Sequence, residues 1–337
     1  MVVILKYQVK NKFTAASIVN KPAAFVKNLL PRGDENYIFC DMSRKSTTIS
    51  VIGPGRLGGT LACAVAAAGY DVKALGVRHV TDAARELADA VGAALLSPTE
   101  AADAADAVFL CCGDDAVENL CQTLVRQGGF LGKNGQYVIH CSGALDSGVL
   151  DAAEKCGCMT GSFHPLQTFP DVQAGLARWA GTHCFIETGY PELREFLHEL
   201  AVKTGAVPHD IDAGQKTLYH AAAALCCNHM TALIDVAMRL FEKTGLGYDE
   251  ALTAAGPIMR ATLENILSKK GSAGALTGPI ARGDVETVKK HLNALNSLPE
   301  TADVYRSLGM ATVSLAQRGG LISDDKAATL RRILDER

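Results

Sequence analysis

A glycine-rich turn near residue 53 has the residue types and the spacing to bind a phosphate. Its pattern is GxGxxG, formed by Gly53, Pro54, Gly55, Arg56, Leu57 and Gly58. The turn follows a β-branched run, Thr48 to Ile52, and opens an alanine-rich helical pattern. In this setting the first glycine permits a tight turn, the second lets the backbone approach a pyrophosphate, and the third lets helix and strand pack closely. The segment therefore predicts a dinucleotide site.

The residues after the second expected strand favour one dinucleotide over the other. NAD sites usually place an acidic residue about 20 residues after the glycine turn, where it binds the ribose 2'-hydroxyl. No acid stands there before Asp82, whereas Arg78 lies just beyond the strand. An arginine at this point can bind a 2'-phosphate, so we expect NADP as the cofactor. The alternative is a solvated loop arginine.

Gly113 and Asp114 follow the fourth expected strand, at an edge of the sheet where ligands collect. A glycine there lets the backbone pass close to the cofactor ribose. We therefore include both residues among the expected cofactor contacts. The alternative for the aspartates at 114 and 115 is that one of them caps a helix beginning near Ala116.

Lys216 and His220 are four residues apart, so they share a face of an expected helix. Hydride transfer from a nicotinamide needs an acid near the developing oxyanion or amine, and either side chain could supply it. Asn228 follows two turns later and is a third polar candidate. The alternative is an exposed Lys216 and a core His220.

His164 ends another expected strand and is held extended by Pro165. We expect its ring at the rim of the active site, although a histidine before proline can also be purely structural. His140 is expected to be a hydrogen-bonded core histidine.

The order of the expected elements indicates an α/β fold. Eight short apolar runs read as strands, at 48–52, 71–75, 93–96, 107–112, 137–141, 159–163, 182–186 and 206–211. Helical stretches separate most of them, which predicts a Rossmann-type, doubly wound, mainly parallel sheet with helices on both faces. After Asp212 only helical patterns follow. We therefore expect a poorly ordered extension at 1–46, an NADP-binding domain at 47–212 and an all-α substrate and dimerisation domain at 213–337.

Several specific strings resemble one known family. They are His140 to Ala144, HPLQTF at 164–169, TGPIARGD at 277–284, Tyr219-His220 and Asn228. The chain resembles proteins that pair a Rossmann-like domain with a helical domain of unassigned function, DUF2520, within the superfamily of 6-phosphogluconate dehydrogenase, pyrroline-5-carboxylate reductase and ketopantoate reductase. The resemblance implies an NADP-dependent oxidoreductase and a homodimer.

The resemblance also bears on site residues. Ser142-Gly143 resembles the Ser-Gly substrate-binding turn of hydroxyacid dehydrogenases in this superfamily, and its alternative is a hydroxyl that caps the next helix. Members of the superfamily carry a lysine followed four residues later by asparagine. Here the second position is His220 and the asparagine is Asn228, so the identity of the acid is open.

Composition excludes several other classes. Hydrophobic residues make up 48% of the 337 residues and the formal charge is -3, so a nucleic-acid partner is not expected. The apolar stretch Ala221 to Cys227 is too short to span a membrane, and we expect it to be buried. Eleven cysteines without a CxxC pair indicate free thiols in a reducing, cytoplasmic compartment and no metal site.

The cofactor motif and the candidate site residues predict hydride transfer between NADPH and a small carbonyl acid. The resemblance implies ketopantoate as the named candidate. An imine reductase resembling pyrroline-5-carboxylate reductase is the alternative enzyme. The third hypothesis is a sensor that binds NADPH and has no enzymatic activity.

Overall fold

The computed structural model describes residues 47–130, 134–268 and 271–336. The expected extension at 1–46 lies outside the described residues. The chain divides into two compact units, one up to Cys227 and one from Asn228 onward. Each unit has its own hydrophobic core.

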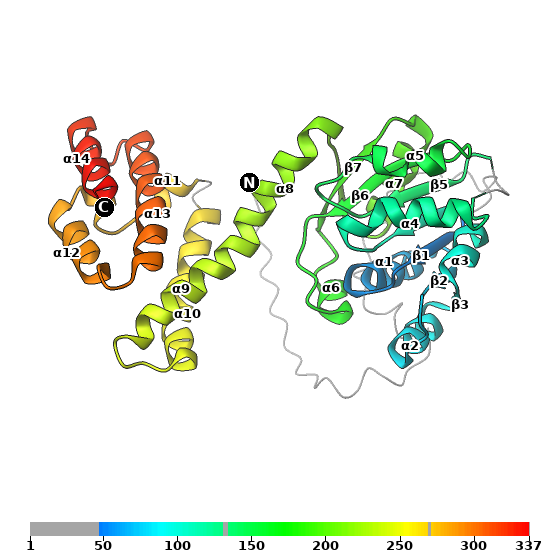
Figure 1. Cartoon of the computed structure of the whole chain (residues 1–337), viewed down its shortest axis with the longest axis horizontal. Helices are drawn as coiled ribbons and strands as arrows, with labels where there is room; N and C mark the ends of the chain where they lie inside the picture. Colours follow the sequence, from blue (N-terminus) through cyan, green and yellow to red (C-terminus); the bar gives the residue numbers. More distant parts are fainter. Residues whose placement is uncertain (1–46, 131–133, 269–270, 337) are drawn as a thin grey trace, which may run out of the picture. The chain divides into compact units, whose positions relative to one another are not determined.

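The first unit contains an eight-stranded sheet in the order β3-β2-β1-β4-β5-β6-β7-β8 (Figure 1). Its strands are β1 Ile49–Ile52, β2 Val72–Gly76, β3 Ala94–Leu96, β4 Ala107–Leu110, β5 Tyr137–His140, β6 Met159–Pro165, β7 His183–Thr188 and β8 Val207–Asp210. The first six strands are parallel to their neighbours; β7 runs antiparallel to β6, and β8 runs parallel to β7. The predicted mainly parallel α/β fold is confirmed.

Helices cover both faces of this sheet (Figure 1). They are α1 Arg56–Ala67, α2 Asp82–Val91, α3 Pro98–Ala104, α4 Asp114–Arg126, α5 Asp151–Glu154, α6 Val172–Ala177 and α7 Pro191–Lys203. Successive strand residues point to opposite faces: Phe109 packs with the core under α1 and α7, whereas Val108 and Leu110 pack with α3 and α4. Because both faces are buried, the strands are apolar throughout rather than alternating.

The second unit is helical in its described residues. Its helices are α9 Met230–Glu242, α10 Tyr248–Ser268, α11 Ser272–Ala275, α12 Val285–Leu295, α13 Pro299–Arg318 and α14 Asp324–Asp335. The TGPIARGD string forms a tight turn before α12, with positive φ at Gly278 and Gly283. Asp284 caps α12 by accepting hydrogen bonds from the Thr287 backbone and hydroxyl.

The division between the units falls later than the expected boundary after Asp212. Helix α8, Lys216–Ala224, belongs to the first unit, and a π-helical segment, Leu225–His229, follows it at the division. Lys216, at the start of the helix, is buried and hydrogen-bonded to Ser142 in the loop after β5 and to Ser162 in β6, which ties the helix to the first unit.

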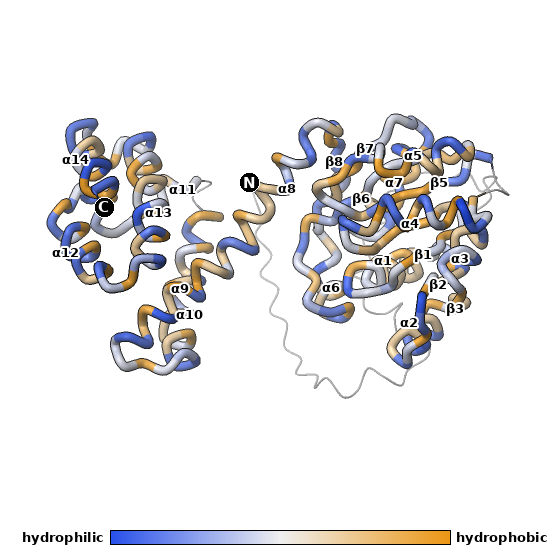
Figure 2. The backbone as a smooth tube through the Cα atoms, viewed as in Figure 1, coloured by the Kyte–Doolittle hydropathy of each residue, from blue (hydrophilic) through white to orange (hydrophobic). Residues whose placement is uncertain are grey.

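The expected burial of Ala221 to Cys227 within the chain is wrong. These residues are exposed or half-buried, and the longer helical stretch Ala213–Glu242 has 6% of its most apolar window buried. Figure 2 shows hydrophobic residues recurring along this stretch among hydrophilic ones. Among the described residues it is the one helix long and apolar enough to cross a membrane, a test of length and composition that the core helix of a soluble protein also passes.

Candidate functional site

The three glycines of the turn between β1 and α1 have different surroundings. Gly53 has φ +83°, and a Cβ there would lie 3.0 Å from the Cys111 carbonyl oxygen. A Cβ on Gly58 would lie 2.4 Å from the Gly53 oxygen, so strand and helix could not pack as closely. Gly55 has no atom within 4 Å of the position its Cβ would take. The turn therefore has an open point, free of side chains, at its second glycine.

The N-terminus of α1 is suited to an anion. Gly55 is the N-cap residue, no side chain caps the helix, and the first turn contains no acidic residue. The first backbone N–H groups of a helix have no partner within it and carry the positive end of the helix dipole. Together with the open space at Gly55, these donors fit a pyrophosphate approaching the turn. Pro54 and Arg56 flank the open point, and Leu57 packs against the core.

The other expected cofactor residues lie at the same edge of the sheet, beyond the carboxyl ends of β2 and β4. Arg78 is exposed in the bend after β2. Gly113 is the N-cap of α4, and Asp114 is its first residue. No side chain caps α4, so the alternative in which one of the aspartates caps a helix starting near Ala116 is wrong.

His140 and Ser142 organise the loop after β5. His140 is fully buried, its Nδ1 accepts from the Ser142 N–H at 3.1 Å, and its Nε2 therefore donates to the Asp146 carbonyl at 3.0 Å. Burial, followed by the charge of Lys216, lowers the pKa of His140 to about 4. The Ser142 Oγ accepts from the N–H groups of Ala144 and Leu145, both at 3.1 Å. The hydroxyl thus closes the bend at Gly143 and Ala144. The next helix, Ser147–Leu150, is capped by Asp146, so the alternative in which Ser142 caps it is wrong.

Two of the predicted histidines lie together over the glycine of this loop. The rings of His164 and His220 are 6.1 Å apart and nearly perpendicular. A Cβ on Gly143 would lie 2.7 Å from His220 Cδ2 and 2.9 Å from His164 Nε2, so only glycine fits beneath the two rings. The Tyr219 hydroxyl lies 2.7 Å from His164 Nδ1. Burial, with a smaller effect from the charge of Lys216, lowers the pKa of His164 to about 4.

Lys216 lies inside the first unit with 1% of its surface exposed, so the alternative of an exposed lysine is wrong. Its Nζ donates to the Ser162 Oγ at 2.6 Å and to the Ser142 carbonyl at 3.1 Å. Burial lowers the pKa of Lys216 to about 8, and the charge of Glu187 opposes this effect. Helix α8 therefore places the Lys216 side chain against Ser162 of β6 and the His220 ring beside Gly143.

Sequence reasoning assigned no site role to Ser162, Glu187 or Tyr219. Ser162 and Glu187 stand in apolar strands and are buried. A polar group is costly to bury without a hydrogen-bond partner. A serine or glutamate inside an apolar strand therefore indicates a buried polar contact, and this was the signal in the sequence. The pairing itself needs the register between β6 and β7, where Ser162 lies opposite Glu187.

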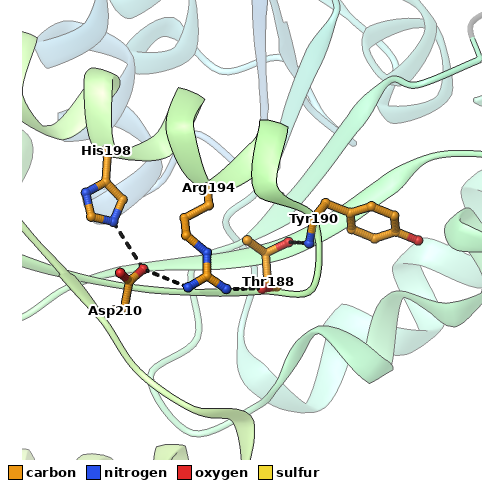
Figure 3. A network of polar contacts seen from close by, with 5 residues as sticks. All are labelled: Thr188, Tyr190, Arg194, His198 and Asp210. Carbon is orange, nitrogen blue, oxygen red and sulfur yellow. Dashed lines mark hydrogen bonds and ion pairs between the residues drawn. The ribbon is translucent and has the colours of Figure 1, made fainter.

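A polar network fixes the strand ends that lead to α8 (Figure 3). Asp210 at the end of β8 lies 3.1 Å from His198 Nε2 and 3.5 Å from Arg194 Nη1, both on α7. Arg194 also donates to the Thr188 carbonyl at 2.7 Å. Thr188 in turn accepts from the Tyr190 N–H at 3.1 Å. Helix α7 thus holds the ends of β7 and β8, six residues before Lys216.

Asn228 belongs to the second compact unit, in the π-helical segment Leu225–His229. The first unit brings together Ser142, His164, Lys216 and His220. The role of Asn228 remains a prediction.

Comparison with protein families assigns both parts of the chain. Residues 33–165 match the Rossmann-like domain, and residues 182–312 match DUF2520, a domain of unknown function. The fold and the glycine turn thus define a Rossmann-type protein. More particularly, the chain is one of the proteins that combine a Rossmann-like domain with DUF2520, as the motifs predicted.

Solved structures share this fold at low identity. Protein TM1727 from Thermotoga maritima is 22% identical, with a TM-score of 0.62 over 80% of this chain and 98% of that chain. Protein BF3122 from Bacteroides fragilis is 24% identical, with a TM-score of 0.60, and the match covers 85% of this chain and 98% of that chain. A pyrroline-5-carboxylate reductase from Coxiella burnetii is 16% identical, with a TM-score of 0.51 over 83% and 100%. No curated protein sequence matches the chain.

Proposed function

We propose that the protein is an NADP-dependent oxidoreductase that reduces a small carbonyl or imine substrate. The glycine turn carries this proposal, because Gly55 leaves space for a phosphate directly at the uncapped N-terminus of α1. Exposed Arg78, and the absence of an acid before Asp82, favour the 2'-phosphate of NADP. BF3122 carries the provisional name of an NADP oxidoreductase, which agrees with this choice.

When bound, NADPH would supply the hydride; the protein must supply donors for the charge that develops on the substrate. Burial raises the pKa of Tyr219, so its hydroxyl keeps its proton, and we propose that it donates to His164 Nδ1. His164 is then neutral, with its proton on Nε2 beside Gly143. We propose that His164 Nε2 and His220 orient the substrate oxygen or nitrogen there. Lys216 adds a cation beneath the Ser142 carbonyl.

The substrate class has two candidates. A cation near the neutral His164 imidazole suits a small carbonyl acid, and ketopantoate is the compound to test first. A cyclic imine is the second candidate, because structures of similar fold include the Coxiella burnetii pyrroline-5-carboxylate reductase and an imine reductase from Myxococcus stipitatus. Tight NADPH binding without turnover of any keto acid or imine would instead favour the sensor.

The test is a binding titration of NADPH and NADH with the wild type and two arginine variants. Arg78→Ala should weaken NADPH tenfold or more and leave NADH nearly unchanged, because NADPH alone has the 2'-phosphate. Arg85→Ala is the matched control, since Arg85 is an exposed arginine on the nearby α2. Equal weakening of both nucleotides by Arg78→Ala would remove Arg78 from this role, and failure of the wild type to bind either would refute the proposal.

We also propose that the protein is a cytoplasmic homodimer. Large apolar side chains are exposed on α8 and α10, among them Leu218, Ile258 and Leu267. In each unit, exposed apolar side chains of this size are typical of an interface. None of the cysteines in the described part of the chain forms a disulfide, which is the usual state in a reducing compartment.

A further inference from the structure

Glu187 is a buried carboxylate at the centre of a hydrogen-bond network. It lies on β7 with 7% of its surface exposed. Its Oε2 accepts from the Ser147 N–H at 2.8 Å, and its Oε1 accepts from the Ser147 hydroxyl at 2.8 Å. The Ser162 hydroxyl also donates to Oε2, at 3.3 Å. All three partners are donors, which is the arrangement that a charged carboxylate requires when it is removed from water.

Ser162 connects Glu187 to Lys216. Its Oγ accepts a hydrogen bond from the Lys216 Nζ at 2.6 Å, and its hydroxyl donates a hydrogen bond to Glu187 Oε2. The serine can fill both roles because a hydroxyl has one donor and two acceptor sites. A buried cation and a buried anion are thus joined through one side chain.

The same pair holds the loop that carries Gly143. Lys216 binds the loop at the Ser142 carbonyl, and Glu187 binds it at Ser147. Between these two points Gly143 lies against the rings of His164 and His220. A change in the charge of Lys216 or Glu187 would therefore reach the groups proposed to face the substrate.

The positive charge of this region is concentrated on Lys216. His140 and His164 both have pKa values of about 4, mainly through burial and then through the charge of Lys216. Both rings are therefore neutral near pH 7, and Glu187 is the first of the anionic groups that favour the ammonium form of Lys216.

We propose that Glu187 is a positioning residue that acts through Ser162 to keep Lys216 as an ammonium ion against the Ser142 carbonyl, so that the site offers one fixed cation to an anionic group of the substrate. This inference rests on the proposed function for its link to substrate. The dependence of the Lys216 charge on Glu187 and Ser162 can be measured without any substrate.

The experiment is an NMR titration of the full chain labelled with ¹³C at lysine Cε. The Lys216 resonance is assigned by its loss in Lys216→Met. In the wild type it should titrate near pH 8, since burial lowers the pKa of Lys216 to about 8. In Glu187→Gln and in Ser162→Ala the midpoint should fall by about one pH unit or more, because each variant removes a group that stabilises the ammonium form. Ser147→Ala is the control: it removes one hydrogen bond of Glu187 but keeps the charge and the serine link, and its midpoint should stay within a few tenths of a unit.

A second measurement separates this inference from the proposed function. NADPH affinity should be the same in all three variants, because none of the three residues lies at the glycine turn. If Lys216 titrates alike in the wild type, Glu187→Gln and Ser162→Ala, Glu187 has a structural role alone and the inference is wrong, even if the protein proves to be a reductase. If the shifts appear but neither NADPH nor any substrate binds, the charge network stands and the proposed function fails.

Discussion

Gly55 and Gly58 differ in the space around them, and this difference predicts opposite effects of the same substitution. Gly55→Ala places a methyl group in open space at a negative φ, so the free energy of unfolding should change by less than about 0.5 kcal/mol. NADPH affinity should nevertheless fall tenfold or more, because the methyl occupies the approach to the turn. Gly58→Ala forces a contact of 2.4 Å with the Gly53 oxygen and should destabilise by about 1–3 kcal/mol.

Urea denaturation and a nucleotide titration on both variants measure these effects. Unchanged NADPH binding in Gly55→Ala would show that the phosphates do not approach the turn at its second glycine.

His140 makes the stability of the first unit sensitive to acid. Its pKa is about 4 in the folded chain and about 6.5 when unfolded, so between these values the unfolded chain binds a proton that the folded chain does not. Stability should therefore fall as the pH falls from 6.5 toward 4. The His140→Asn variant cannot take up this proton; it should be less stable at pH 7 but lose less on going to pH 4.5. Urea midpoints at the two pH values test this, and parallel losses in variant and wild type would contradict it.

At the residue scale the sequence predicted which side chains carry polar chemistry better than which partners they have. The spacing of Lys216 and His220 correctly predicted that they lie on one helix, α8. It could not predict that the Lys216 side chain is buried, because its hydrogen-bond partners, Ser142 and Ser162, are 74 and 54 residues away in the sequence. Such pairings arise from tertiary packing, which local patterns do not contain.

The elements themselves were largely predictable, because buried strands of a doubly wound sheet are continuous apolar runs. All eight expected strands occur, and no bound differs by more than two residues. The reversal of β7 was not predicted. Two consecutive strands are parallel when the connection runs back to the opposite end of the sheet, and antiparallel when it stays at the same end. The segment between β6 and β7 contains the short helix α6, and β7 runs antiparallel to β6.

The network at the ends of β7 and β8 permits a prediction for α7. The Arg194 and Asp210 side chains are about half exposed, so their ion pair should contribute less than about 1 kcal/mol. Arg194→Ala and Asp210→Ala should each cost more than the coupling between them, because the arginine also donates to the Thr188 carbonyl and the aspartate also accepts from His198 Nε2. A double-mutant cycle by urea denaturation measures both terms. A coupling energy well above about 1 kcal/mol would contradict this prediction.

For the whole molecule, the exposed apolar side chains on α8 and α10 predict self-association. The wild type should have a mass in light scattering of twice the 35.5 kDa of the chain. Replacing Ile258 and Leu267 by glutamate should yield monomers, because each places a charge in the interface. Val202→Glu is the matched control, since Val202 is an exposed apolar residue on α7. A monomeric wild type, or a double variant that remains dimeric, would contradict the proposed interface.

The contact between α1 and α6 has a consequence for how relatives of this chain can vary. A Cβ on Gly59 would lie 2.8 Å from Val172 Cγ2, and a Cβ on Gly175 would lie 2.5 Å from Thr60 Oγ1. Each helix thus presents a glycine to a side chain of the other, and neither glycine has room for a methyl group. In an alignment of homologues, a larger residue at position 59 should therefore occur with a smaller one at 172, and a larger residue at 175 with a smaller one at 60. Lineages that have lost the α6 segment should be free to carry larger residues at position 59.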